Sequence, residues 1–296
     1  MIPRHRPAGT DREPVGVVGA GLIGSAIVSI LVHHHPVTVQ DPSARARRAA
    51  EDAGATAVTG LGEVEMPRVV LLALPGPDQV RAVTTELLAA EQCPDVVVDL
   101  STVDPETTRE VAEQAAAHQV AHLDAPILGR PHRVGAWTLP VGGEAAALER
   151  VRGILERLAT KVVHVGPSGS GNVLKLLNNL MFGAINAITV ETMAAAARLG
   201  LDPAVYADTI ADSGAASVSG LFRELAPKIV DGDFAPTFSV DLLTKDNRLA
   251  VEMAQAAGIR LDVAEAVLAL DRAAQTAGLG ELDTSAMVQL FDEDAD

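Results

Sequence analysis

The fold is set by the sequence Val15-Gly-Val-Val-Gly19-Ala-Gly21-Leu22-Ile23-Gly24-Ser-Ala26. Its first part predicts a short buried strand, and a G-x-G-x-x-G pattern joins that strand to an apolar helix ending near Val32. Gly19 permits the tight turn, Gly21 lets a pyrophosphate approach the backbone, and Gly24 lets strand and helix pack closely. The pattern therefore predicts a dinucleotide site, with the phosphates at the N-terminus of the helix. A tight turn without a ligand is the alternative.

The alternation of strand and helix continues through the first half of the chain. Further strands are predicted at residues 36–41, 69–74, 96–100, 120–124, 138–141 and 161–165. This alternation predicts an α/β fold of Rossmann type, with a doubly wound parallel sheet. Ligands of such sheets bind beyond the C-terminal ends of the strands. Pro75, Ser101, Thr102 and the loop Asp124-Ala-Pro126 fall at these ends.

After Gly171 the apolar residues follow a helical period. Helices are predicted near residues 170–199, 203–213, 216–231, 239–257, 262–278 and 283–291. Gly200, Gly258 and Gly278 are expected to end three of them. The predicted divisions of the chain are a flexible arm at 1–13, an NAD(P)-binding Rossmann domain at 14–167, an all-α substrate and oligomerisation domain at 168–291 and an acidic tail at 292–296.

The composition argues against several classes of function. The 296 residues carry 23 basic and 39 acidic side chains, a net charge of −16, which disfavours nucleic acid or an anionic membrane as a partner. Cys93 is the only cysteine, so an intrachain disulfide is excluded. The N-terminal residues lack the apolar core of a signal peptide, and no uncharged apolar run reaches the ~18 residues of a membrane span. We therefore expect a cytoplasmic protein.

Two groups of histidines invite a metal site. His33-His-His35 closes the first helix, but adjacent helical residues point in different directions and cannot readily chelate one ion. His118 and His122 are four residues apart, but the second falls in a predicted strand. No metal site is therefore expected.

Asp41 bears on the choice of cofactor. It ends the second strand, 22 residues after Gly19, where an acid normally bonds the adenosine ribose hydroxyls. Its carboxylate would repel a 2′-phosphate, which predicts NAD as the preferred cofactor. NADP stays possible, because Arg45, Arg47 or Arg48 could reach a phosphate. Solvated helix charges are the preferred interpretation of these three arginines.

The chemistry is expected in the segment Gly166-Pro-Ser-Gly-Ser-Gly-Asn-Val-Leu-Lys175-Leu-Leu-Asn178-Asn179. It predicts a glycine-rich turn that enters a long helix, on which Lys175 and Asn179 share a face and Asn178 lies beside them. Apolar surroundings can lower the pKa of Lys175 toward neutrality, as a proton-transfer residue requires. The alternative is a lysine that reaches water from a core helix.

Four motifs, in order along nearly the whole chain, resemble the β-hydroxyacid dehydrogenase family of 3-hydroxyisobutyrate dehydrogenase-like enzymes. They lie at residues 19–24, 124–143, 166–179 (G-x-x-G-x-G-x-x-x-K-x-x-N-N) and 238–246, which ends in a Lys-Asp pair. The resemblance implies Lys175 as the catalytic acid/base, Asn179 as a residue that orients the substrate, and Lys245 as a contact of the nicotinamide. It also implies a helical domain that packs against a partner subunit, in a homodimer or homotetramer.

The motif, the strand ends and the resemblance together give one set of cofactor-binding residues. They are Gly19, Gly21, Leu22, Ile23, Gly24, Asp41, Leu74, Pro75, Thr102 and Lys245.

Two departures from the family pattern affect the substrate and the cofactor. The family loop usually reads D-A-P-V-S-G-G, and its serine and glycine hold the substrate carboxylate; here it reads Asp124-Ala-Pro-Ile-Leu128-Gly129-Arg130. Gly129 remains for substrate binding, and Arg130 could clamp a carboxylate, sulfonate or phosphate with its planar fork. A surface arginine in a proline-rich loop is the alternative. NADP-preferring members often carry Asn-Arg-Thr where this chain has Gln40-Asp41-Pro42, which strengthens the prediction of NAD.

The sequence therefore predicts an NAD(P)-dependent oxidoreductase that interconverts a small anionic 3-hydroxy acid, or a related anionic alcohol, and its semialdehyde. Lys175 would move the proton while the nicotinamide carries the hydride. An imine reductase shares this architecture but usually has Asp or Tyr at the lysine position. A nucleotide sensor without catalysis is the alternative from another class, disfavoured by Lys175, Asn179 and Lys245 together. The substrate itself is left open.

Overall fold

The computed structural model describes residues 13–60, 65, 67–214 and 219–291. These residues form two compact units that divide between Lys175 and Leu176. The predicted acidic tail, and all of the predicted arm except Glu13, lie outside the described residues. The domain boundary expected at residues 167 and 168 stays a prediction.

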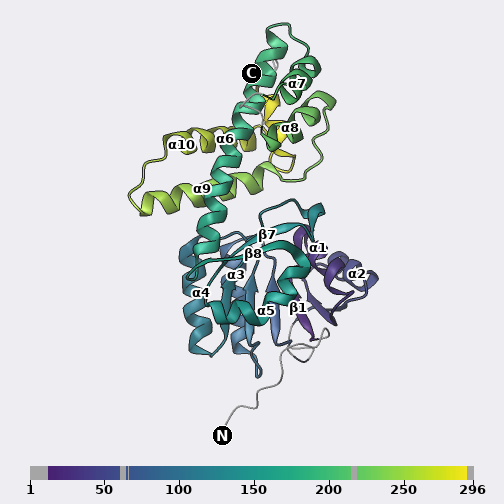
Figure 1. Ribbon diagram of the computed structural model, residues 1–296, viewed down its shortest axis with the longest axis vertical. Coiled ribbons are helices and arrows are strands. Elements are labelled where there is room, and N and C mark those ends of the chain that lie inside the picture. Colours follow the sequence, from purple (N-terminus) through teal and green to yellow (C-terminus); the bar gives the residue numbers. More distant parts are fainter. Residues whose placement is uncertain (1–12, 61–64, 66, 215–218, 292–296) are drawn as a thin grey trace. The chain divides into compact units, whose positions relative to one another are not determined.

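One sheet organises the first unit (Figure 1). In the described residues it has eight strands, in the order β3-β2-β1-β4-β5-β6-β7-β8. The strands are β1 (Val15–Val18), β2 (Val37–Gln40), β3 (Thr56–Val58), β4 (Val69–Leu72), β5 (Val96–Asp99), β6 (Ala121–Asp124), β7 (Trp137–Gly142) and β8 (Ala159–Gly166). The strands from β3 to β6 pair in parallel, and the strand order reverses between β1 and β4 as in a doubly wound sheet. The predicted Rossmann-type fold is confirmed.

Two features of the sheet differ from the prediction. β7 pairs antiparallel with β6, because the connection between them holds a short 3-10 helix, η2 (Pro131–Arg133), in place of a crossover helix. β8 then runs parallel to β7, so the prediction of a wholly parallel sheet is wrong at this edge. β3 was not predicted, because a strand of three residues is too short to show a period.

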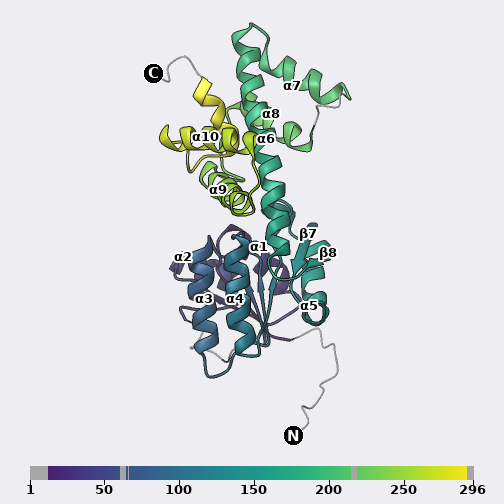
Figure 2. The same ribbon diagram turned by 90° about the vertical axis from the view of Figure 1, so that its left-hand side faces the viewer.

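Helices cover both faces of the sheet (Figure 2). They are α1 (Leu22–Leu31), α2 (Ala44–Asp52), α3 (Pro77–Ala89), α4 (Pro105–Ala117) and α5 (Ala145–Leu158). Successive strand residues point to opposite faces, so Val17 packs in the core with α1, α2 and α5, whereas Val18 packs in the core with α3 and α4. Because both faces are buried, the strands read as continuous apolar runs.

The second unit is helical. It contains most of α6 (Ser170–Arg198) together with α7 (Pro203–Asp212), α8 (Gly220–Asp231), α9 (Val240–Ala256), α10 (Asp262–Thr276) and the 3-10 helix η3 (Thr284–Phe291). Gly200, Gly258 and Gly278 follow α6, α9 and α10 with φ angles of 81°, 70° and 81°, so they end these helices as predicted. The helix expected at 283–291 is of 3-10 type; the amide of Ala286 donates to the carbonyl of Asp283, an i→i+3 bond.

The length and composition of α6 bear on the membrane prediction. Among the described helices it is the one long and apolar enough to cross a membrane, with 29 residues. Its most apolar window is 39% buried. A single helix of this kind is weak support for a membrane span, because the core helices of soluble proteins have the same length and composition.

Candidate active site

The glycine-rich turn between β1 and α1 has the shape that a dinucleotide requires. Gly19 has a φ of +91°, and a Cβ there would collide with the carbonyl oxygen of Ala73. A Cβ on Gly24 would collide with the carbonyl of Gly19. A Cβ on Gly21, in contrast, would meet no described atom within 4 Å. The backbone at Gly21 therefore faces open space, where the pyrophosphate was expected.

The first turn of α1 is open to an anion. Gly21 is the N-cap, and among the described residues no side chain caps this helix. Leu22 is 62% exposed, whereas the side chain of Ile23 packs against the core of the first unit. Helix N–H groups at such an end, together with the helix dipole, favour a phosphate. The residues present fit the pyrophosphate of a nicotinamide dinucleotide.

Asp41, the acid expected to bond the adenosine ribose, lies beside this turn. Its side chain is buried; Oδ2 accepts a 2.7 Å hydrogen bond from the amide of Ala20, and Oδ1 accepts one of 2.7 Å from the amide of Ser43. Arg47 donates to the carbonyl oxygens of Asp41 and Pro42 at 2.8 and 2.9 Å. These contacts hold the end of β2 against the glycine-rich turn.

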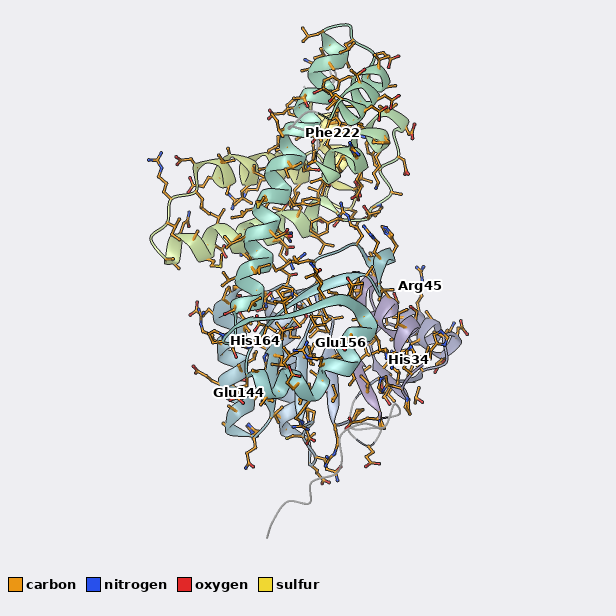
Figure 3. All side chains as sticks on the ribbon, in the orientation of Figure 1. His34, Arg45, Glu144, Glu156, His164 and Phe222 are labelled. Atoms are coloured by element: carbon orange, nitrogen blue, oxygen red, sulfur yellow. The ribbon has the colours of Figure 1, made fainter. Side chains whose placement is uncertain are left out.

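The other arginines after β2 differ from Arg47 in their surroundings. Arg45 lies on α2 with an exposed side chain (Figure 3). Arg48 is also exposed. Both therefore match the interpretation of solvated helix charges, whereas Arg47 donates hydrogen bonds to backbone carbonyls.

The sheet brings Leu74, Pro75 and Thr102 to one edge. β4 and β5 are neighbours, with Leu72 paired to Asp99, so the residues that follow them leave the sheet side by side. Ser101, which the sequence placed at the end of β5, links the two segments, because its Oγ accepts a 2.9 Å hydrogen bond from the amide of Leu74. Oδ1 of Asp99 in turn accepts one of 2.9 Å from the amide of Ser101.

Asp124 has a role that the sequence did not reveal. It ends β6 and is fully buried. Its Oδ1 accepts a 2.8 Å hydrogen bond from the amide of Gly169, and its Oδ2 accepts one of 2.9 Å from the amide of Asn172. Burial raises the pKa of this carboxyl group, and bonds from backbone amides partly offset the rise. The start of α6 is therefore held at the C-terminal edge of the sheet.

Lys175 and Asn179 lie on α6 as predicted. Lys175 is half-buried, three residues after the anchored Asn172. Because α6 is continuous over these positions, the spacing of four residues puts Lys175 and Asn179 on one face. Asn178 is exposed, and its Nδ2 donates to Oδ1 of Asn179 at 3.1 Å.

The second unit brings Asn179 and Lys245 together through a third residue. Nδ2 of Asn179 donates a short hydrogen bond to Oδ2 of Asp246. Nζ of Lys245 lies 3.0 Å from Oδ1 of the same carboxylate. Asp246 is 3% exposed. The sequence signal for this pairing was the Lys-Asp dipeptide, but nothing in the sequence connected it to the asparagine.

The loop that contains Gly129 and Arg130 is fixed by the single tryptophan of the chain. Trp137 is fully buried, and its Nε1 donates to the carbonyl of Arg130 at 2.8 Å. Gly129 has a φ of +153°, and a Cβ there would lie 2.6 Å from Cδ1 of Trp137. Leu128 forms a two-way backbone bridge with Thr138. The backbone of this loop is therefore ordered up to Arg130.

Metal ligands do not gather in the described residues, which hold no group of three or more His, Cys, Asp or Glu side chains suited to an ion. His118 bonds the carbonyl of Gln114 at 3.0 Å through Nδ1. His122 is buried in β6, and burial lowers its pKa to about 4, which keeps it neutral.

Two family models match the chain. Residues 14–166 match the NAD binding domain of 6-phosphogluconate dehydrogenase. Residues 169–291 match the NAD-binding domain of NADP-dependent 3-hydroxyisobutyrate dehydrogenase. The 3-hydroxyisobutyrate dehydrogenase of Pseudomonas aeruginosa is 32% identical over 254 residues, which cover 82% of this chain and 85% of that protein. The chain belongs to the β-hydroxyacid dehydrogenase family.

Two further comparisons extend over more of the chain. The NAD-dependent L-serine dehydrogenase of Pseudomonas aeruginosa is 29% identical over 292 residues, which cover 95% of this chain and 98% of that one. The crystal structure of a 3-hydroxyisobutyrate dehydrogenase from Salmonella typhimurium aligns with a TM-score of 0.85 at 29% identity, over 94% of this chain and 99% of that chain. This β-hydroxyacid dehydrogenase is therefore an NAD(P)-dependent oxidoreductase, which confirms the predicted enzyme class.

Proposed function

We propose that this β-hydroxyacid dehydrogenase interconverts a small anionic 3-hydroxy acid and its semialdehyde, with Lys175 as the general acid/base. One observation carries the proposal. Lys175 and Asn179 share a face of α6, and the amide of Gly169, just before this helix, is bonded to Asp124 at the end of β6. The lysine therefore enters from the edge of the sheet where ligands of doubly wound folds bind.

Lys175 moves the proton in this proposal. During oxidation, Nζ of the neutral lysine accepts the proton of the substrate hydroxyl, and the hydride leaves the carbon that bears this hydroxyl. During reduction, the ammonium donates that proton to the oxygen that gains negative charge. The bound nicotinamide supplies or accepts the hydride. General acid–base help of this kind is worth about 10²–10⁴-fold in rate.

Asn179 orients the substrate oxygen. An amide nitrogen carries two hydrogens, and Nδ2 of Asn179 donates one of them to Asp246. We assign the second hydrogen to the hydroxyl or carbonyl oxygen of the substrate. The buried carboxylate of Asp246 also holds Lys245, the residue we assign to the nicotinamide.

Gly129 and Arg130 bind the anionic end of the substrate. A guanidinium group holds a carboxylate in a bidentate geometry, and the bond from Trp137 fixes the backbone from which Arg130 extends. Substrates named for relatives, 3-hydroxyisobutyrate and L-serine, both carry a carboxylate and a hydroxyl two carbons from it. Molecules of this class are the first to test.

NAD is the preferred cofactor in this proposal. The carboxylate of Asp41 lies at the glycine-rich turn and accepts the amide of Ala20, where a second negative group would be repelled. The contacts of Arg47 with backbone carbonyls leave it poorly directed for a 2′-phosphate. The glycine-rich turn, Leu74, Pro75 and Thr102 complete the cofactor site.

The protein acts as a homodimer or homotetramer in the cytoplasm. Exposed apolar side chains support the assembly: Leu177, Met181 and Ile188 on α6 are 49, 68 and 56% exposed. Their spacings of four and seven residues put them on one stripe of the helix. A stripe of this kind is typical of a surface that a second subunit covers. Light scattering on the purified protein measures the assembly directly, and a monomer at micromolar concentration would exclude it.

The experiment that tests the catalytic assignment is a comparison of wild type with Lys175→Ala. 3-Hydroxyisobutyrate, L-serine and the matching semialdehydes are the substrates, and a cyclic imine is included. We expect turnover of a carboxylated substrate, loss of most of kcat in Lys175→Ala, and unchanged binding of NADH by fluorescence. Turnover of the imine alone would indicate an imine reductase. Cofactor binding with no turnover of any substrate would indicate a sensor.

A further inference from the structure

Gly169 directly precedes helix α6 and has no side chain to act as an acceptor, although the first amides of a helix need partners. Asp124 supplies the acceptors from β6, 45 residues earlier in the chain, by bonding the amides of Gly169 and Asn172. A carboxylate in this place is also stabilised by the positive end of the helix dipole.

Two glycines lie close to the carboxylate of Asp124. A Cβ on Gly142 would collide with its Oδ1, and a Cβ on Gly171 would lie 2.9 Å from its Oδ2. Two glycines thus make room for the carboxylate between β7 and α6. The backbone therefore approaches the carboxylate closely from both sides, while backbone amides bond each of its oxygens.

Asn172 connects the same turn of α6 to the segment after β5 and to α4. The side chain is fully buried. Its Oδ1 accepts a 3.2 Å hydrogen bond from the amide of Val103, and its Nδ2 donates to Oγ1 of Thr108 at 3.1 Å. Val103 directly follows Thr102, and Thr108 lies on α4. The first turn of α6 is therefore joined to the segment after β5 as well as to β6.

We propose that Asp124 and Asn172 are positioning residues for the reaction. Together they fix the turn of α6 that precedes Lys175 to the ends of β5 and β6, and so set where the lysine meets a substrate. The inference rests on the proposed role of Lys175 as the acid/base. We assign neither residue a contact with the reacting atoms; both act by holding the first turn of the helix.

The variants Asp124→Asn and Asn172→Ala test this inference. Asp124→Asn keeps the shape but turns one acceptor into a donor that faces a backbone N–H, and Asn172→Ala removes the second tether. Misplacement of a reacting group by ~1 Å can cost on the order of 10²-fold in rate. We expect kcat to fall about 10- to 100-fold in Asp124→Asn and about 5- to 10-fold in Asn172→Ala, with KM and the Kd of NADH within about twofold of wild type.

Asp202→Ala is the control. Oδ1 of Asp202 caps α7 by accepting a 2.8 Å hydrogen bond from the amide of Ala204, and alanine removes this helix cap. No residue of α7 has a proposed role in the reaction. We expect Tm to fall in all three variants and kcat to stay unchanged in Asp202→Ala alone.

Hydrogen exchange measures the anchoring without turnover. The amides of Gly169 and Asn172 should exchange faster in Asp124→Asn than in Asp202→Ala. Loss of kcat in Lys175→Ala, but equal kcat in Asp124→Asn and Asp202→Ala, overturns the positioning role and leaves the proposed function standing. Unchanged kcat in Lys175→Ala overturns the proposed function itself. If Asp124→Asn does not fold, the fall in kcat of Asn172→Ala at unchanged KM decides the question.

Discussion

Nδ2 of Asn247 donates a 2.6 Å hydrogen bond to Oδ2 of Asp271, and both side chains are fully buried in the helical unit. Burial raises the pKa of Asp271 to about 6 from its ordinary value of 3.8, and the bond from Asn247 opposes only part of the rise. Among the described residues, Oδ1 of Asp271 and Oδ1 of Asn247 have no hydrogen-bond donor. The pair is therefore a source of pH-dependent stability.

Asp271→Asn should stabilise the protein at neutral pH. The folded state ionises this group at higher pH than the unfolded chain, so stability falls as the pH rises from about 4 through about 6. The asparagine abolishes this loss, and its amide can donate to Oδ1 of Asn247. We expect a gain on the order of 1–3 kcal/mol at about pH 8 and little change near pH 4, measured as Tm. An equal shift of Tm at both pH values would contradict the assignment.

Gly183→Ala should destabilise the helical unit. Gly183 lies inside α6, and a Cβ there would come within 2.6 Å of Nδ2 and 3.2 Å of Oδ1 of Asn247. Because that amide is held by Asp271, it cannot yield without loss of its hydrogen bond. We expect a loss of about 1–3 kcal/mol in the free energy of unfolding, as is typical of overpacking.

The control for Gly183→Ala is Gly153→Ala. Gly153 also lies inside a helix, α5, but a Cβ there would meet no described atom within 4 Å. Alanine in an open helical position is worth about 0.5–1 kcal/mol over glycine. The two changes should therefore have opposite signs in urea unfolding, and a stabilising Gly183→Ala would show that the contact with Asn247 gives way.

Asp41→Asn should weaken the preference for NAD. The change removes the negative charge that opposes a 2′-phosphate and one of the two acceptors that hold Ala20 and Ser43. We expect the ratio of kcat/KM for NAD to that for NADP to fall by about tenfold, since one charge contact is worth about 1.4 kcal/mol or more. Arg45→Ala is the control, because its exposed side chain should affect neither cofactor. A wild-type enzyme that prefers NADP would overturn the assignment at once.

The local features of this chain could be predicted because each rests on residues close in sequence. The turn at Gly19 needs a positive φ, and the ends of α6, α9 and α10 need the same at the glycines that follow them. The direction of β7 could not be predicted in this way. It depends on the connection from β6, which contains the short 3-10 helix η2 in place of a crossover helix. Lys175 and Asn179 were placed on one face from their spacing alone.

The contacts that complete the site join residues far apart in sequence. Asp124 bonds amides 45 and 48 positions away, and Asn179 bonds Asp246 across 67 positions. A buried acid at the end of a strand and an acid after a lysine were visible as residues, but their partners follow only from the fold. This is why the sequence identified the side chains proposed for the chemistry and missed those that hold them.

Arg130→Ala should raise KM for anionic substrates and leave kcat nearly unchanged. In the proposal, Arg130 holds the carboxylate equally in the ground state and the transition state, so its loss removes uniform binding. A hydrogen bond to a charged group is worth about 1.5–3 kcal/mol, which predicts a rise in KM of roughly 10- to 100-fold. The Kd of NADH should not change.

Arg133→Ala is the matched control for Arg130→Ala. Arg133 lies three residues further on, in η2, and is exposed, so its removal changes the net charge by the same amount without touching the backbone that Trp137 holds. Both variants are assayed over carboxylated, sulfonated and phosphorylated aldehydes of equal length. A larger loss for one head group identifies the anion that Arg130 binds, because the planar fork fits the oxygens of each group differently. Equal KM values in Arg130→Ala and Arg133→Ala would indicate that Arg130 is a surface charge that does not bind the substrate.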